Sequence, residues 1–124
     1  MPTAVEDVVR GFIDALNKLD VDGMIATFAP DAEVRFPGLA TTDLAGFRQF
    51  LEQAAGAVRD NRMEEKELFA TEYGAAVRWI YDATTKAGRT ARCEVVDSWL
   101  VKDGKATSLA VYGDVTPLLA ALQG

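Results

Sequence analysis

A chain of 124 residues with 49% hydrophobic residues is long enough to bury one core, so we expect a single domain over 1–124. The net charge of −6 argues against nucleic acid and membranes as partners, because both would require a basic surface. One cysteine and no histidine exclude internal disulfides, zinc sites built on Cys or His, and Ser-His or Cys-His nucleophiles. We therefore expect no metal and no cofactor, and acid–base chemistry falls to Asp, Glu, Tyr or Lys.

The N-terminus lacks a basic stretch followed by an apolar run, and no apolar run is long enough to span a membrane. We therefore expect a cytoplasmic protein.

The first part of the chain has the periodicity of helices. Thr3 and Glu6 have the spacing of a capping box, and they precede an amphipathic helical pattern that extends to Leu19. Asp20 can cap a shorter second helix that runs through Phe28, after which an Ala-Pro-Asp turn ends it.

Strands dominate the rest of the chain. A short strand is predicted over 32–36, and a third helix over 43–59 with Thr42 or Asp43 as its cap. Four further strands are predicted over 63–73, 75–85, 90–101 and 105–115. A short terminal helix is predicted over 116–122. Helices followed by a meander indicate an α+β fold with the helices packed on one face of the sheet.

The strand predicted over 90–101 carries an acidic residue, Asp97, at its centre. On the pleat Asp97 shares a face with Cys93, Val95, Trp99 and Val101. A buried charge costs several kcal/mol unless it is paired or neutralised, so burial should raise the pKa of Asp97 above about 3.9. Asp97 is therefore the leading candidate for a contact with a ligand, and the alternative is a structural acid bonded to Tyr112 or to a turn amide.

The Asp103-Gly104 pair has the signature of a two-residue turn, which predicts the register of the last hairpin. The predicted pairs on the inner face are Trp99 with Ser108, Asp97 with Ala110, Val95 with Tyr112, and Cys93 with Asp114. Tyr112 then lies diagonal to Asp97, within reach of its phenol, and the small Ala110 leaves space opposite. Such a strand pair is typical of a cavity wall.

Three segments carry a family resemblance: FIDALNKLDVDGM at 12–24, FAPDAEVRFPG at 28–38 and VDSW at 96–99. They resemble the nuclear transport factor two-like superfamily, and within it the group of ketosteroid isomerases and SnoaL-type polyketide cyclases. The resemblance implies a cone-shaped α+β barrel, with three helices on a curved, mostly antiparallel sheet around an apolar pocket. This superfold also serves dehydratases, epoxide hydrolases and binding domains, so it does not select a reaction.

The resemblance also implies the loss of catalytic groups. The oxyanion tyrosine of the isomerases would fall on Phe12, and their proton-shuttling aspartate on Phe36. Asp97 matches their second oxyanion acid, which stays protonated in an apolar site and donates a hydrogen bond. A phenylalanine of the family's pocket corresponds to Tyr112. The Arg-x-Asp element of limonene-epoxide-hydrolase-like members is missing before Asp97.

The candidate catalytic residues are Asp97, Tyr112 and Asp114, although for Asp114 a structural role as a strand-end residue or a helix cap near Thr116 is favoured. The candidate pocket comprises Phe12, Phe28, Val34, Phe36, Trp79, Tyr81, Val95, Trp99 and Ala110. The faces of Trp79 and Tyr81 stay open, because the length of the following loop allows two strand registers.

These residues allow a cofactor-independent isomerase, cyclase or hydrolase that acts on a small, apolar carbonyl-bearing or polycyclic compound. They also allow a domain that only binds an apolar ligand, which the two phenylalanines favour, or a dimeric scaffold with an incidental cavity. The opposite sheet face would present Val96, Leu100, Leu109 and Val111. We expect a homodimer through this face, because related cone-fold proteins commonly associate there.

Overall fold

The computed structural model describes residues 4–37 and 40–123. Along these ranges the elements are α1 (Val5–Asn17), α2 (Val21–Ile25), β1 (Phe28–Arg35), α3 (Leu44–Ala57), β2 (Val58–Ala70), β3 (Gly74–Thr85), β4 (Thr90–Lys102), β5 (Lys105–Gly113) and α4 (Thr116–Gln123).

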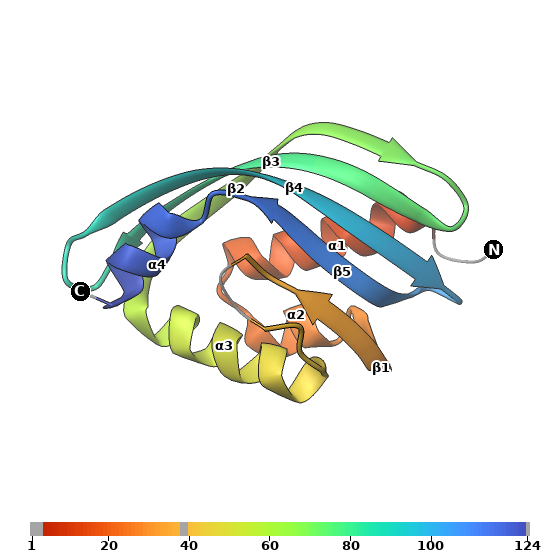
Figure 1. The fold of residues 1–124 in the computed structure, drawn as a ribbon, viewed down its shortest axis with the longest axis horizontal. Coiled ribbons are helices and arrows are strands. Elements are labelled where there is room, and N and C mark those ends of the chain that lie inside the picture. Colours follow the sequence, from red (N-terminus) through yellow and green to blue (C-terminus); the bar gives the residue numbers. More distant parts are fainter. Residues whose placement is uncertain (1–3, 38–39, 124) are drawn as a thin grey trace.

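The strands form one sheet in the order β1-β5-β4-β3-β2. All neighbouring pairs are antiparallel except β1 with β5, which run parallel. The sheet curves over the helices, which lie on its concave side (Figure 1). The α+β prediction is confirmed, but the cone is an open sheet with β1 and β2 as its edges rather than a closed barrel.

Aspartate side chains cap the N-termini of two helices, as predicted. Asp20 accepts a hydrogen bond from the Gly23 amide at 3.0 Å, and Asp43 accepts one from the Gly46 amide at 2.9 Å. The first helix has Ala4 as its cap residue, which offers no side-chain bond. Thr3, the predicted cap, lies outside the described residues.

Two predicted boundaries are wrong. Helix α2 ends at Ile25, and Phe28 already begins β1, so the predicted turn is part of a strand. Pro30 fits there because β1 is an edge strand, where a missing N–H breaks no ladder bond. Strand β2 begins at Val58, directly after α3, and not at 63.

The turn between β4 and β5 is the predicted one. Asp103 and Gly104 have φ angles of 54° and 77°, and the flanking Lys102 and Lys105 pair with each other. Positive φ at both central residues is the type I′ geometry that suits the twist of a hairpin.

The register predicted from this turn is nevertheless wrong. Val101 pairs with Ala106, but Leu100 pairs with Ser108, so Thr107 is an extra residue in β5. Its hydroxyl group donates to the Leu100 carbonyl at 3.3 Å. A one-residue bulge moves every later side chain of the strand to the other face.

Leu109 and Val111 therefore face inward, opposite Trp99 and Asp97. Ala110 and Tyr112 are paired with outward-facing residues of β4, and Tyr112 is 52% exposed. The prediction that places them beside Asp97 is wrong, and so is the prediction that Leu109 and Val111 belong to the outer face.

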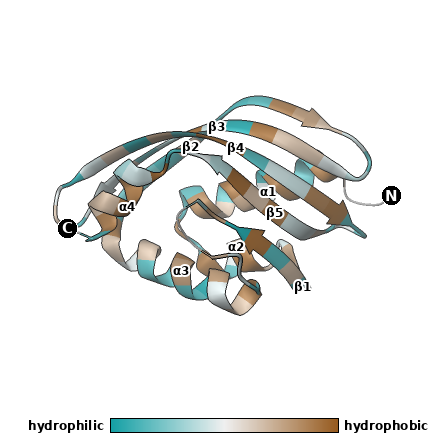
Figure 2. Ribbon diagram, viewed as in Figure 1, coloured by the Kyte–Doolittle hydropathy of each residue, from teal (hydrophilic) through white to brown (hydrophobic). Residues whose placement is uncertain are grey.

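Apolar side chains fill the space between the helices and the concave face. Strand β4 alternates strictly between buried and exposed residues. Hydrophobic residues occur on the helices as well as on the strands around this core (Figure 2). Among the described residues, no helix is both long and apolar enough to cross a membrane.

Candidate functional site

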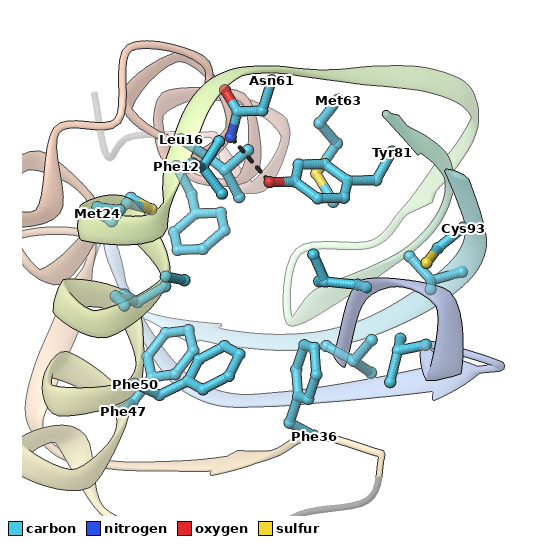
Figure 3. Close-up of a pocket in the computed structure, with 18 of the residues that line it drawn as sticks. Phe12, Leu16, Met24, Phe36, Phe47, Phe50, Asn61, Met63, Tyr81 and Cys93 are labelled. Carbon is cyan, nitrogen blue, oxygen red and sulfur yellow. Dashed lines mark hydrogen bonds between the residues drawn. The ribbon is translucent and has the colours of Figure 1, made fainter. Parts of the chain in front are cut away.

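A cavity of about 100 Å³ lies between the helices and the concave face of the sheet. All four helices and strands β2 to β5 contribute to its lining, which is largely apolar. Figure 3 shows the aromatic side of the cavity, with Phe36, Phe47 and Phe50, facing a polar side with Asn61 and Tyr81. The remaining polar side chain of the wall is Asp97.

Asp97 is only 2% exposed, and its backbone pairs with Val77 on one side and Val111 on the other. Its Oδ2 accepts a hydrogen bond from the indole Nε1 of Trp79 at 2.8 Å. Its Oδ1 is buried and finds no partner within the described part of the chain. The carboxyl group is therefore half satisfied and borders an apolar space.

Burial raises the pKa of Asp97 from 3.8 to about 7, because the charged form loses its hydration. The hydrogen bond from Trp79 opposes this rise. The Trp99 indole also lowers the pKa of Asp97, although its N–H forms no hydrogen bond to a described residue. The protonated and ionised forms of Asp97 are thus both populated near neutral pH.

Trp79 is fully buried on the inner face, which settles an orientation that the sequence left open. It pairs with Val95, so Asp97 is its diagonal neighbour on β4 and lies within reach of its indole. Trp79 holds the Asp97 carboxyl group through its indole hydrogen bond but does not itself line the cavity.

Asn61 and Tyr81 form a second polar group on the wall. The Asn61 Nδ2 donates to the Tyr81 hydroxyl oxygen at 3.0 Å. Asn61 pairs with Ala83 and Tyr81 with Met63, which makes the two polar residues diagonal neighbours across β2 and β3. Burial raises the pKa of Tyr81, while the bond from Asn61 acts against that rise.

Sequence reasoning missed Asn61. The available signal was a polar residue at an inward position of β2, but the predicted strand began two residues beyond it.

The sequence pattern of the SnoaL-like domain matches residues 9–109. The chain belongs to the SnoaL-like family. Solved structures with the same fold include an NTF2-like protein of unknown function from Burkholderia pseudomallei, with 18% identity, 98% of this chain and 99% of that chain covered, and a TM-score of 0.83. TerC co-crystallised with polyporic acid has 22% identity, 98% and 100% coverage, and a TM-score of 0.81. An LEH-like epoxide hydrolase from M. tuberculosis has 19% identity, 94% and 86% coverage, and a TM-score of 0.76.

At these identities the solved structures show the fold alone. No curated protein matches the sequence.

Five of the predicted site residues line the cavity of this SnoaL-like domain: Phe12, Phe36, Tyr81, Val95 and Asp97. The positions at which the isomerases would carry their tyrosine and their aspartate thus do face the cavity, but with phenyl rings.

Other predicted lining residues lie elsewhere. Phe28 and Trp99 are stacked on each other at 5.7 Å and form an aromatic cluster with Phe12 and Phe47. This cluster is part of the core that supports the cavity. Val34 lines a neighbouring hollow that also borders Phe36, Phe47 and Phe50.

Asp114 lies on the surface after β5 and caps α4. The Thr116 hydroxyl group lowers the pKa of Asp114, and so does the Thr116 amide, which donates a hydrogen bond to its Oδ1 at 2.9 Å. The prediction that Asp114 lies opposite Cys93 is wrong, because the bulge shifts the end of β5. The alternative helix-cap interpretation matches the observed contact.

Proposed function

We propose that this SnoaL-like domain binds a small, mostly apolar molecule and transfers a proton to or from it with Asp97. The observation that carries the proposal is the half-satisfied carboxyl group in the wall of an apolar cavity. A structural acid would be expected to have a paired cation or several donors, whereas Trp79 is the one donor to Asp97 among the described residues.

The pKa of about 7 suits both directions of proton transfer. The ionised Asp97 can take a proton from a carbon next to a carbonyl group, which leaves an enolate and a neutral carboxyl group. The neutral carboxyl group can then return the proton to the same carbon or to another atom of the ligand. Isomerisation and ring closure without a cofactor consist of such steps, and the cyclase and epoxide hydrolase names among the structural neighbours support this class.

The size of the cavity limits the ligand. Its volume of about 100 Å³ is below that of engineered cavities of roughly 150 Å³ that accept benzene, and below the roughly 300 Å³ of small ligand pockets. The enclosed part therefore suits a single ring or a short chain. A polycyclic ligand would need movement of Phe36 and Phe50, whose ring centres are 5.0 Å apart and which also border the neighbouring hollow.

Exchange of α-hydrogens in cyclohexanone tests the proposal. In D₂O the ionised Asp97 should remove an α-proton and return a deuteron, and NMR measures the loss of the proton signal. We expect the enzymatic rate to rise with pH through about 7, and to fall roughly 100-fold or more in Asp97→Asn. Glu94→Gln, an exposed change of the same kind on the same strand, should retain the rate. Equal rates for Asp97→Asn and wild type would refute the assignment.

The second candidate function is binding without chemistry. Phe12 and Phe36 line the cavity where the isomerases would have a donor and a base, and this observation favours it. Stabilisation of the protein by cyclohexanone in a heat melt, with no hydrogen exchange above buffer, would support binding alone. Under either function we expect no turnover of a steroid β,γ-enone, because these two rings cannot transfer protons and the cavity is small.

A further inference from the structure

The polar groups of Asn61 and Tyr81 are not used by the proton transfer assigned to Asp97. The Tyr81 oxygen accepts the hydrogen bond from Asn61, so the hydrogen of its own hydroxyl group remains free to donate. The Asn61 Oδ1 is buried and finds no partner among the described residues. The pair therefore has at least one free donor and at least one free acceptor.

This count does not depend on the orientation of the Asn61 amide. If the amide were rotated by half a turn, the Tyr81 hydroxyl would donate to Oδ1, leaving the Nδ2 hydrogens as donors and the phenol oxygen as acceptor. In both arrangements the complementary ligand group must donate one hydrogen bond and accept another. A ketone only accepts and an ammonium group only donates, whereas a hydroxyl group does both.

The charge of the surroundings selects a neutral group. No lysine or arginine is found among the described residues that line the cavity, so a carboxylate or phosphate placed there would be buried without a counter-ion. Burial also keeps Tyr81 in its protonated, donating form, since it raises the pKa of the phenol. An uncharged hydroxyl group fits this end of the cavity best.

The pair is held in place by contacts from α1. The Asn17 side chain, at the end of that helix, accepts from the Met63 amide at 2.7 Å and donates to the Met63 carbonyl at 3.3 Å. Met63 pairs directly with Tyr81, so both strands that carry the polar pair are fixed at this point. A polar subsite on fixed strands loses little ordering entropy when it binds a ligand.

We propose that Asn61 and Tyr81 form a hydroxyl-recognition subsite, so that the ligand carries a neutral alcohol or phenol group at the end away from Asp97. Tyr81 lies four residues along β3 from Val77, the partner of Asp97, which separates the two polar ends along the strand direction. In Figure 3 the pair lies across the cavity from Phe36, Phe47 and Phe50. The inference deepens the proposed function and rests on it for the identity of the cavity as a ligand site.

Binding of phenol and toluene, measured by titration calorimetry or by shifts in amide NMR signals, tests the subsite. The two probes have nearly the same shape, and the ratio of their affinities is compared between variants so that their different hydrophobicity cancels. Tyr81→Phe and Asn61→Leu should each lower the phenol-to-toluene ratio about five- to tenfold, because each leaves the bound hydroxyl short of one partner. Tyr73→Phe, the same change at an exposed tyrosine outside the cavity, should leave the ratio unchanged.

Two further measurements keep the test decisive. Anisole accepts but cannot donate a hydrogen bond, so the wild-type protein should bind it more weakly than phenol. This comparison needs no variant, so it still tests the subsite if a variant fails to fold. Asp97→Asn should abolish hydrogen exchange in cyclohexanone but keep the phenol-to-toluene ratio, which separates the two proposals. An unchanged ratio in Tyr81→Phe, or no binding of phenol to the wild type, would overturn the subsite.

Discussion

Strand β4 carries a carboxyl group on each of its two faces, and the surroundings of the two groups are opposite. Asp97 faces inward and accepts a hydrogen bond from an uncharged indole, and no lysine or arginine lines its cavity in the described part of the chain. Glu94, three residues earlier, faces outward and accepts a hydrogen bond from Arg78 at 2.8 Å. Arg78 also donates to Glu67 at 2.7 Å. Burial without a counter-ion, rather than the presence of a carboxylate, distinguishes the candidate site from the charged surface.

Because of this difference, ionisation of Asp97 on the inner face lowers the stability of the fold at high pH. Ionisation of the carboxylates on the outer face changes stability little. An ionised Asp97 has lost its water and gains only one donor, whereas water and arginine both stabilise the outer carboxylates. Substitutions on the two faces should therefore differ in size, and also in how their effects change with pH.

The largest effect is expected from Trp79→Phe. This substitution leaves a small cavity and removes the hydrogen bond that the Trp79 indole donates to Asp97. We expect a loss of about 3–4 kcal/mol in the free energy of unfolding at pH 8. The loss should be about 1–2 kcal/mol smaller at pH 5, where Asp97 is protonated and the lost bond is no longer charge-assisted. Urea melts at the two pH values measure the difference, and an equal loss at both would show that Trp79 acts only by packing.

Asp97→Asn should have the opposite sign. The folded-state pKa near 7 exceeds the ordinary 3.8, so between these values the folded protein binds more protons than the unfolded chain. The contribution of Asp97 to stability is therefore greatest below about pH 4 and falls between about pH 4 and pH 7, by roughly 4 kcal/mol in total.

Asparagine removes the charge and keeps an oxygen for the Trp79 indole. We expect Asp97→Asn to stabilise the protein by about 1–3 kcal/mol at pH 8, less than the full penalty because its N–H groups lack an acceptor. The gain should vanish by pH 5 in urea melts. A clear loss of stability at pH 8 would show that Asp97 is a structural acid.

The inner face of β4 could be predicted because its first six residues alternate between polar and apolar types, and burial continues this alternation through all thirteen residues. The facing strand could not be predicted from its turn, because a bulge at Thr107 leaves the turn unchanged and shifts everything after it. The apolar pattern of β5 indicated the correct inner face, since Leu109 and Val111 alternate with the smaller or polar Ser108 and Ala110. Where a turn and an apolar pattern disagree, a bulge reconciles them.

Asn61 could not be assigned for a different reason. Helix α3 passes into β2 between Ala57 and Val58 with no turn residue between them, so nothing in the sequence marks the start of the strand. The partnership of Asn61 with Tyr81 also depends on the register of β2 against β3, which includes two irregularities. Long-range pairing of this kind is not encoded in local propensity.

A change on the outer face should affect association rather than folding. We propose that a second copy of the chain covers this face, because no described helix lies over it and its apolar centre is flanked by charges of both signs. That centre includes Val96, Leu100 and Tyr112, all of which are exposed in the single chain. Light scattering should give twice the chain mass at micromolar concentration, and Leu100→Asp should weaken association at least about tenfold.

Gln53→Asp, an exposed charge change on α3 away from the sheet, provides the control and should leave the dimer intact. A monomeric wild type at high concentration would contradict the proposed assembly.

The smallest effect is expected from Glu94→Gln, which makes the same change of carboxyl to amide as Asp97→Asn on the same strand. Arg78 keeps its bond to Glu67 when Glu94 is neutral, and exposed ion pairs contribute little to stability. Urea melts should therefore show no resolved change between pH 5 and pH 8. If two copies of the chain meet at the outer face, any small effect of Glu94→Gln on stability should grow with protein concentration. The effect of Asp97→Asn should not depend on protein concentration. A stability change in Glu94→Gln that follows pH as Asp97→Asn does, at every concentration, would mean that burial does not set the behaviour of the two carboxylates.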